Sequence, residues 1–172
     1  MRLFVAITLP PEAKKRLSQV QAVLRSLGDG SFPSEQLLHL TLAFLGQTNN
    51  SSGAKRALEA VKCAPFVLTI QTLGNFGSLY WAGCAPSEPL NRLQRELCEQ
   101  LRMEGFLLED RPFRHHLTLC RKYRPFAPLN LSTAAQALGA IQVDVQSVSL
   151  MRSDRIDGRL QYTPLVTHPL LG

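Results

Sequence analysis

Two hydrophobic spacings alternate along the chain and predict its secondary structure. Residues 3–9 are mostly aliphatic, aromatic or β-branched and predict a strand, and the proline pair at its end suits the first turn of a helix. Over residues 13–27, apolar residues recur every three or four positions, which predicts an amphipathic helix. The same spacings predict further strands at 38–45, 66–73, 79–84, 116–121, 143–151 and 160–166, and further helices at 54–61, 90–101 and 132–138.

Glycine, proline and charged residues predict the connections between these elements. Gly74 and Gly77 are expected to turn the chain between two strands. A proline-rich loop is expected at 125–131, and the basic run of Arg152, Arg155 and Arg159 is expected in a loop between the last two strands.

Two stretches of the chain resemble each other. Residues 38–42 read Leu-His-Leu-Thr-Leu and residues 115–119 read His-His-Leu-Thr-Leu, which separates His39 from His116 by 77 positions. Each stretch falls on a predicted strand that follows a leucine-striped helix. A separation just under half of the chain is what an ancient duplication would leave. We therefore expect residues 1–172 to form a single domain made of two pseudo-repeated lobes.

Each copy of the repeat has one polar face. Because side chains alternate along a strand, His39 and Thr41 share a face, and His116 and Thr118 do the same. If a pseudo-two-fold axis relates the copies, both polar faces line one cleft, and two imidazoles flank one ligand. A single His-Leu-Thr-Leu would indicate no more than an amphipathic strand, whereas two matched copies indicate a site.

Two imidazoles and two hydroxyls suit the opening of a cyclic phosphodiester. One imidazole takes a proton from water and the other gives a proton to the departing alkoxide, since an ordinary histidine pKa of about 6.5 allows either role near neutral pH. The threonine hydroxyls can donate hydrogen bonds to the phosphoryl oxygens, where negative charge develops. Such a site needs no metal or other cofactor, because phosphoryl transfer depends mainly on positioning and charge stabilisation.

Composition and charge add modest information. Apolar residues make up 45% of the chain, enough for a sizeable core. Lys and Arg outnumber Asp and Glu by 19 to 13, and most of these cations are Arg, whose planar fork suits phosphate. The excess favours an anionic partner, although a basic surface that only maintains solubility explains the charge equally well.

Cysteine usage and hydropathy predict the setting. Cys63, Cys84, Cys98 and Cys120 form no Cys-x-x-Cys pair, which argues against a zinc ribbon and against a dense disulfide framework. No stretch approaches the roughly 18 apolar residues of a membrane span. We expect free thiols in a soluble, cytoplasmic protein that does not interact with membranes, and nothing in the sequence requires more than a monomer.

The sequence resembles the two-histidine phosphoesterases, and within them the RNA 2′,3′-cyclic phosphodiesterases once described as 2′-5′ RNA ligases. The resemblance spans nearly the whole chain. It is carried by residues 2–7 (Arg-Leu-Phe-Val-Ala-Ile), 38–46 (Leu-His-Leu-Thr-Leu-Ala-Phe-Leu-Gly), 111–113 (Arg-Pro-Phe), 116–121 (His-Leu-Thr-Leu-Cys-Arg) and 162–165 (Tyr-Thr-Pro-Leu).

This resemblance implies a bilobal α+β fold, with two antiparallel sheets flanked by helices around a central cleft. It implies that His39 donates the proton, that His116 activates water, and that the 3′ ester is cleaved to leave a 2′-phosphate. The two nearly symmetric motifs give no independent way to choose these roles. The substrates implied are RNA ends or nucleotides bearing a 2′,3′-cyclic phosphate, tRNA fragments among them.

The chain departs from the family at His115, where the family often has proline. By alternation His115 faces away from His116, so we interpret it as a surface or structural residue. Thr118, two residues after His116, favours His116 as the catalytic member of the adjacent pair.

Phe44 and Arg121 each follow their motif histidine by five residues. The resemblance makes them candidates for stacking a base and gripping phosphate. Strict alternation places both on the core face, and a bulge would be needed to turn them into the cleft.

The remaining basic cluster has a functional and a structural interpretation, whereas the other aromatic residues and the last histidine have only a structural one. The cluster Arg111, Arg114, Arg121, Lys122 and Arg124 fits either an RNA-guiding surface or a solvated rim. Tyr80 and Trp81 are expected to pack within a strand. His168 is expected in an exposed tail.

Three other functions fit the same residues less well. The histidine pair could run in reverse and ligate a cyclic end to a 5′-hydroxyl, against the high concentration of water. A nucleotide-sensing module would bind without turnover, yet would not need two titrating groups. A metal hydrolase would need carboxylate or cysteine ligands beside the histidines.

Overall fold

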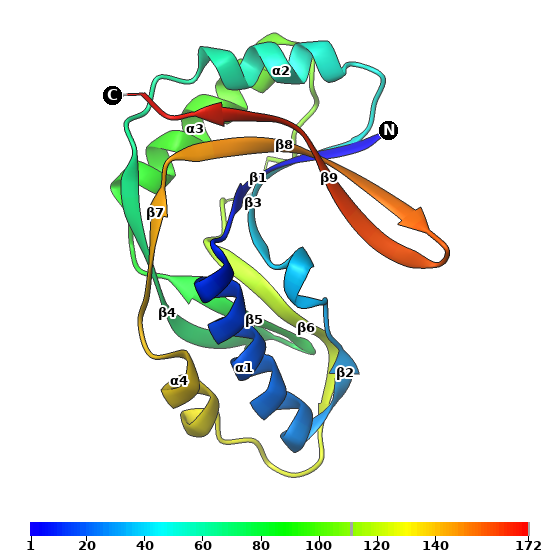
Figure 1. Ribbon diagram of the computed structural model, residues 1–172, viewed down its shortest axis with the longest axis vertical. Coiled ribbons are helices and arrows are strands. Elements are labelled where there is room, and N and C mark those ends of the chain that lie inside the picture. The colour runs from blue at the N-terminus through cyan, green and yellow to red at the C-terminus, as the bar shows by residue number, and fades with distance from the viewer. Residues whose placement is uncertain (111, 172) are drawn as a thin grey trace.

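A computed structural model describes residues 1–110 and 112–171, and it shows two antiparallel sheets with helices on their outer faces (Figure 1). The strands are β1 (Arg2–Thr8), β2 (Gly28–Ser31), β3 (His39–Gln47), β4 (Phe66–Phe76), β5 (Leu79–Cys84), β6 (His116–Pro125), β7 (Ile141–Val145), β8 (Ser147–Ile156) and β9 (Arg159–Pro169). The helices are α1 (Pro11–Leu27), α2 (Ser51–Ala60), α3 (Glu88–Met103), α4 (Ser132–Leu138) and the 3₁₀ turn Glu35–Leu37. The first sheet has the order β3-β1-β8-β9, and the second has the order β2-β6-β5-β4-β7.

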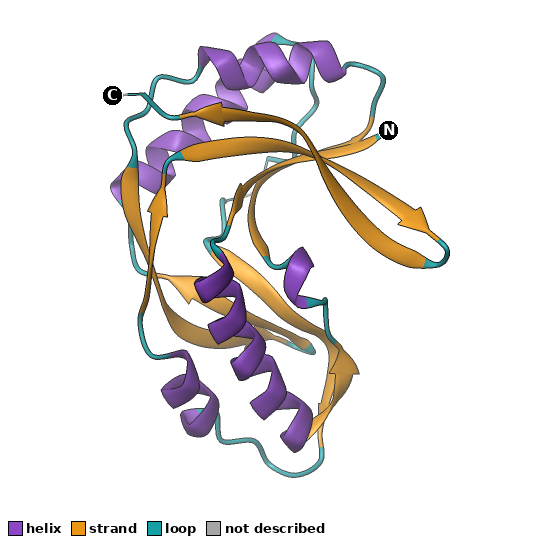
Figure 2. Ribbon diagram, in the orientation of Figure 1, coloured by secondary structure: helices purple, strands orange, loops and turns teal. Residues whose placement is uncertain are grey.

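The helices form where the hydrophobic spacing predicts them. Helix α1 begins at the second proline of the pair and buries an apolar stripe that includes Leu17, Val20 and Leu24. Helix α3 begins after Ser87, whose hydroxyl accepts a hydrogen bond from the Leu90 amide. Helices α1 and α4 pack against the second sheet, whereas α2 and α3 pack against the first (Figure 2).

The chain crosses between the two halves. Helix α1 directly follows β1 of the first sheet but packs against β2 and β6 of the second, and α3 directly follows β5 of the second sheet but packs against β3 of the first. One continuous cluster of buried apolar side chains joins both halves. Each half therefore contains a helix that directly follows a strand of the other half.

The two sheets have corresponding strand orders. Without β2, the second sheet is the row β6-β5-β4-β7, which parallels the row β3-β1-β8-β9 of the first. Each His-x-Thr motif begins the strand at the end of its row, and β3 and β6 contact each other. The two halves thus have corresponding strands, and their origin by duplication stays a prediction. The α+β fold with two antiparallel sheets is confirmed.

Five details of the sequence prediction were wrong or incomplete. The predicted strand 143–151 is two strands, β7 and β8, that lie in different sheets, because the chain leaves one sheet at Gln146 and enters the other. Gly74 lies within β4, and the turn is made at Gly77, whose φ of 57° favours glycine. The short strand β2 was not expected, since its Gly-Asp-Gly-Ser sequence resembles a loop.

The fourth and fifth corrections concern the last hairpin. The basic run is not a loop: Arg152 and Arg155 lie in β8 and Arg159 begins β9, so that only Asp157 and Gly158 separate the strands. His168 also lies in β9, not in a tail. Arg111, which belongs to the Arg-Pro-Phe motif and to the basic cluster, lies outside the described residues.

Candidate active site

A cleft of about 1180 Å³ lies between the two sheets. Its walls come from β3 and the β8–β9 hairpin on one side, and from β6 and the segment before β3 on the other. All six residues singled out from the sequence line this one cleft: His39, Thr41, Phe44, His116, Thr118 and Arg121. The tertiary structure therefore brings together two motifs that lie 77 residues apart.

A β-bulge turns Phe44 into the cleft. The pairing of β3 with β1 skips Leu42, because Thr41 and Ala43 pair with consecutive residues of β1. Leu42 and Ala43 are both buried, and the alternation resumes with Phe44 on the same side as His39 and Thr41. The Phe44 ring is 70% exposed. Strict alternation would have buried this ring in the core.

An equivalent bulge turns Arg121 into the cleft. The pairing of β6 with β5 skips Leu119, because Thr118 and Cys120 pair with consecutive residues of β5. Leu119 and Cys120 are both buried, and Arg121 emerges on the face of His116 and Thr118. The two motif strands thus share a bulge at the same place, and each bulge delivers the fifth residue after the histidine to the cleft.

Hydrogen bonds hold the His39 imidazole at both nitrogens. Nδ1 lies 2.6 Å from the Leu37 carbonyl oxygen, an acceptor, so Nδ1 carries a proton and donates it. Nε2 lies 2.6 Å from the Thr41 hydroxyl. The neutral ring therefore has its lone pair on Nε2, and this nitrogen can exchange a proton with a ligand. The rings of Phe4 and Tyr162 pack around the imidazole, with centroids 5.1 and 5.3 Å away.

Burial lowers the pKa of His39 below its ordinary value. The hydrogen bond to the Leu37 carbonyl acts in the opposite direction, and the positive charges of Lys14 and Arg121 add to the lowering. Negative charge that enters the cleft opposes this lowering and favours protonated His39. A phosphate beside Arg121 supplies such charge.

Stacking holds the His116 imidazole. Its ring lies parallel to the Trp81 indole at a centroid distance of 3.6 Å and an interplanar angle of 9°. The Phe76 ring contacts both of them, and the Arg114 guanidinium lies 4.5 Å from the Phe76 centroid. Gly74 makes room for the indole, since a Cβ atom there would collide with Trp81.

Burial also lowers the pKa of His116, helped by the positive charge of Arg114 and by His115. His116 is therefore neutral near neutral pH, the form that a base requires. The sequence prediction that Trp81 packs within a strand is correct, but it missed that the partner of Trp81 is the motif histidine.

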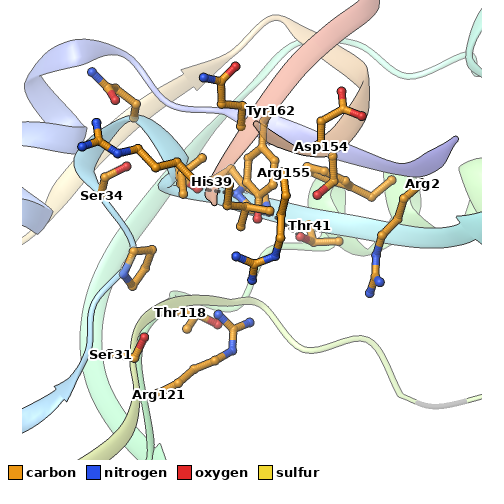
Figure 3. Close-up of a pocket in the computed structure, with 18 of the residues that line it drawn as sticks. Arg2, Ser31, Ser34, His39, Thr41, Thr118, Arg121, Asp154, Arg155 and Tyr162 are labelled. Carbon is orange, nitrogen blue, oxygen red and sulfur yellow. Dashed lines mark hydrogen bonds between the residues drawn. The ribbon is translucent and has the colours of Figure 1, made fainter. Parts of the chain in front are cut away.

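Several cleft residues were not predicted from the sequence. Tyr162 packs edge-on against the His39 imidazole, and Arg155 extends from the β8–β9 hairpin toward the space above Arg121 and Thr118 (Figure 3). Burial raises the pKa of the Tyr162 hydroxyl, so this group remains a hydrogen-bond donor. The only sequence signal for these residues was the closing Tyr-Thr-Pro-Leu stretch and the basic run that was assigned to a loop.

The described lining is strongly cationic. It contains Arg2, Arg121, Arg155 and Arg159 and, as its acidic member, Asp154. The Asp154 carboxylate accepts a hydrogen bond of 2.7 Å from the Arg152 guanidinium. The cleft therefore favours an anionic ligand.

His115 lies outside the cleft lining. Its Nε2 is hydrogen-bonded to the Asn91 side chain of α3, and its ring contacts Phe113. This is the structural placement that strand alternation predicted. Of the basic cluster, Arg121 lines the cleft and Arg114 lies against Phe76, whereas Lys122 and Arg124 are exposed.

Comparison with known proteins identifies the family. A model of the 2′-5′ RNA ligase superfamily matches residues 9–157. The chain belongs to the 2′-5′ RNA ligase superfamily. An RNA 2′,3′-cyclic phosphodiesterase of Geobacillus stearothermophilus is 32% identical over 98% of this chain, which spans 57% of that relative's length. Another superfamily relative, the RNA 2′,3′-cyclic phosphodiesterase of Escherichia coli, is 30% identical over 95% of this chain and 93% of its own.

A solved structure from this superfamily has the same fold. Escherichia coli LigT complexed with 3′-AMP superimposes with a TM-score of 0.82 and 26% identity, covering 99% of this chain and 98% of that chain. In the described part of this chain, no group of three or more His, Cys, Asp or Glu side chains is arranged to hold a metal ion. None of its described helices is long and apolar enough to span a bilayer.

Proposed function

We propose that this chain is an RNA 2′,3′-cyclic phosphodiesterase, which hydrolyses a terminal 2′,3′-cyclic phosphate to a 2′-phosphomonoester. The observation that carries the proposal is the meeting of His39 and His116, from two separate motifs, in one arginine-lined cleft. The relatives named above carry this activity in their names, and the LigT complex contains a nucleoside monophosphate.

In this reaction His116 is the base and His39 is the acid. Neutral His116 takes a proton from water, which attacks the phosphorus, while protonated His39 gives the proton on Nε2 to the departing 3′ oxygen. Thr41, Thr118 and Arg121 stabilise the negative charge on the phosphoryl oxygens. The exposed Phe44 ring stacks on the terminal base.

The substrates that we propose are RNA ends and nucleotides, with tRNA fragments among them. The proposed setting is the cytoplasm, since Cys63, Cys84, Cys98 and Cys120 are free thiols. We propose that the chain acts as a monomer, because one chain supplies both histidines and all the other groups assigned above. We also propose that it needs no metal or cofactor, because two imidazoles can carry out both proton transfers.

The test uses a short RNA that ends in a 2′,3′-cyclic phosphate, incubated with the protein in EDTA, with a His39→Ala, His116→Ala double variant as the matched control. The expected product carries a 2′-phosphate, identified by chromatography against 2′- and 3′-phosphate standards. A 3′-phosphate product would contradict the assigned cleavage, and inhibition by EDTA that Mg²⁺ reverses would contradict metal independence.

Two further outcomes distinguish the alternative functions. Binding of the cyclic end without conversion would favour a sensor. A joined product, formed when a second RNA with a 5′-hydroxyl is added, would show ligation, and its yield relative to hydrolysis would measure how far that reverse reaction competes.

A further inference from the structure

The two bulges leave a leucine without a partner in each motif strand. Leu42 and Leu119 are the residues that the pairing skips between the motif threonine and the fifth residue after the histidine, and both are buried. A further shift between β1 and β3 skips Leu45, beyond Phe44. A buried carbonyl group that is not paired in the sheet needs another donor, because leaving it unsatisfied is costly. A side chain from a neighbouring element can supply this donor.

A glutamine side chain from a packed helix donates to each of these carbonyl groups. Gln21 of α1 donates from Nε2 to the Leu119 oxygen at 3.0 Å. Gln94 of α3 donates from Nε2 to the Leu42 oxygen at 3.5 Å and also contacts the Cys98 sulfur at 3.0 Å. Gln21 is 1% exposed, and it is one of two polar residues in the described chain that are fully buried.

The two glutamines occupy equivalent places in the repeat. Residues 17–24 read Leu-Ser-Gln-Val-Gln-Ala-Val-Leu and residues 90–97 read Leu-Asn-Arg-Leu-Gln-Arg-Glu-Leu, so both fit Leu-x-x-(Val/Leu)-Gln-x-x-Leu. Because the chain crosses between the halves, the helix before the first motif supports the second motif, and the helix before the second motif supports the first. The same device therefore occurs once on each motif strand.

Gln21 has a second contact that links the two motifs. Its Nε2 also donates to the Pro33 carbonyl oxygen at 3.0 Å. Pro33 lies in the segment that lines the cleft and leads to Leu37, whose carbonyl oxygen orients His39. One buried amide thus ties the bulge beside Arg121 to the segment that orients His39.

We propose that Gln21 and Gln94 are positioning residues of the active site, each fixing the bulge that turns a ligand-binding side chain into the cleft. Gln21 acts through Arg121, and Gln94 acts through Phe44. Without the donated hydrogen bond, a strand can recover its carbonyl pairing by slipping one residue, which moves the fifth residue after the histidine to the other face. The kinetic part of this proposal rests on the proposed phosphodiesterase function, and the structural part does not.

Double-mutant cycles test the pathway of action. Gln21→Met and Gln94→Met keep the side-chain length but remove the donor, and Gln19→Met makes the same change on the exposed face of α1. We expect Gln21→Met and Gln94→Met each to lower kcat/KM about tenfold, mainly by raising KM. A tenfold loss corresponds to the typical net contribution of one hydrogen bond. Gln19→Met is expected to leave both constants unchanged.

The second substitution in each cycle identifies the residue that each glutamine supports. In an Arg121→Ala background, Gln21→Met should lose most of its effect, whereas Gln94→Met should keep its own. In a Phe44→Ala background the pattern should reverse. Effects that multiply in both backgrounds would overturn the proposal, because they would show a general loss of structure.

Crystal structures of the variants test, without any activity measurement, whether the glutamines fix the bulges. The expected result is a changed pairing of β5 with β6 in Gln21→Met, and of β1 with β3 in Gln94→Met. An unchanged bulge with Arg121 or Phe44 still in the cleft would overturn the proposal. This result does not depend on the proposed function, since it is read from the structure even if the wild-type protein hydrolyses no cyclic phosphate. If Gln21→Met does not fold, the half-buried Gln94 gives the same test.

Discussion

The two motif strands have the same sequence pattern and the same bulge, but they hold their histidines in different ways. On β3, His39 is fixed by the Leu37 carbonyl at one nitrogen and by the Thr41 hydroxyl at the other. On β6, His116 is fixed by a parallel indole, and its Nδ1 is buried without a hydrogen-bond partner among the described residues. Two copies of one sequence motif therefore have different surroundings in the structure.

This difference matches the two chemical roles proposed above for the histidines. The Leu37 carbonyl fixes the tautomer of His39 and leaves Nε2 to carry the proton that the proposed mechanism gives to the departing oxygen. Stacking fixes the plane of His116 but supplies no negative charge that would stabilise its protonated form. The second histidine therefore stays neutral and ready to accept a proton. The Leu37 carbonyl and the Trp81 indole, which hold the two imidazoles, both lie outside the repeated stretches.

The largest expected effect tests whether both histidines act. His39→Ala and His116→Ala should each reduce kcat by about 10²- to 10⁴-fold, because each removes one of the two proton-transfer groups. Thermal unfolding should show that the variants remain folded. The measurement is single-turnover hydrolysis of a cyclic-phosphate RNA. Substantial activity in either variant would end the acid–base assignment.

Substitutions of the two threonines test whether the two motif strands differ in how they hold their histidines. Thr41→Ala and Thr118→Ala should each lower kcat on the order of 10²-fold, the value of one lost charge-stabilising donor. Only Thr41→Ala should also shift the alkaline limb of the pH–rate profile, since only Thr41 is bonded to its histidine among the described contacts. Serine at either position keeps the hydroxyl and is the matched control. Equal shifts in both alanine variants would argue against this asymmetry.

The stack on β6 can be weakened without touching a motif residue. Trp81→Leu should lower kcat by up to about tenfold with a small change in KM, because an aromatic contact of this kind contributes about 0.5–1.5 kcal/mol. Trp81→Phe keeps a ring and should retain most of the rate. If KM changed instead of kcat, the indole would be acting on substrate rather than on His116.

The pH dependence follows from the lowered pKa values of both histidines. Activity falls at low pH as His116 becomes protonated, and falls at high pH as His39 loses its proton, so the profile is bell-shaped. Because both values lie below 6.5 in the free protein, kcat/KM should peak below pH 6.5. Bound phosphate favours protonated His39 and should move the kcat maximum to higher pH. Coincident maxima would contradict this effect of the substrate.

The smallest expected effect concerns the adjacent histidine. His115→Ala should change kcat/KM by less than about threefold, since this side chain lies outside the cleft lining and bonds to Asn91. Steady-state kinetics beside His116→Ala provide the comparison. A dead His115→Ala variant with an active His116→Ala variant would exchange the roles of the two neighbours.

Much of the site could be predicted from single residues and their spacing. His39, Thr41, His116 and Thr118 were placed on one face of each strand by simple alternation, and all four line the cleft. Phe44 and Arg121 depended on bulges that no local pattern identified, because a bulge is a property of the pairing between two strands. Arg155 and Tyr162 come from a hairpin whose strands were predicted too short.

Most of the helices and strands, the repeat and the chemistry proposed for the two motifs could be predicted from the sequence alone, because hydrophobic spacing and residue type are local properties. The arrangement of these motifs in the site depends on the tertiary structure. That structure brought the motifs to one cleft, exchanged the supporting helices between the halves, skipped Leu42 and Leu119 in the sheets, and set Trp81 against His116. Each of these depends on contacts between residues far apart in the chain, which no single segment of the sequence specifies.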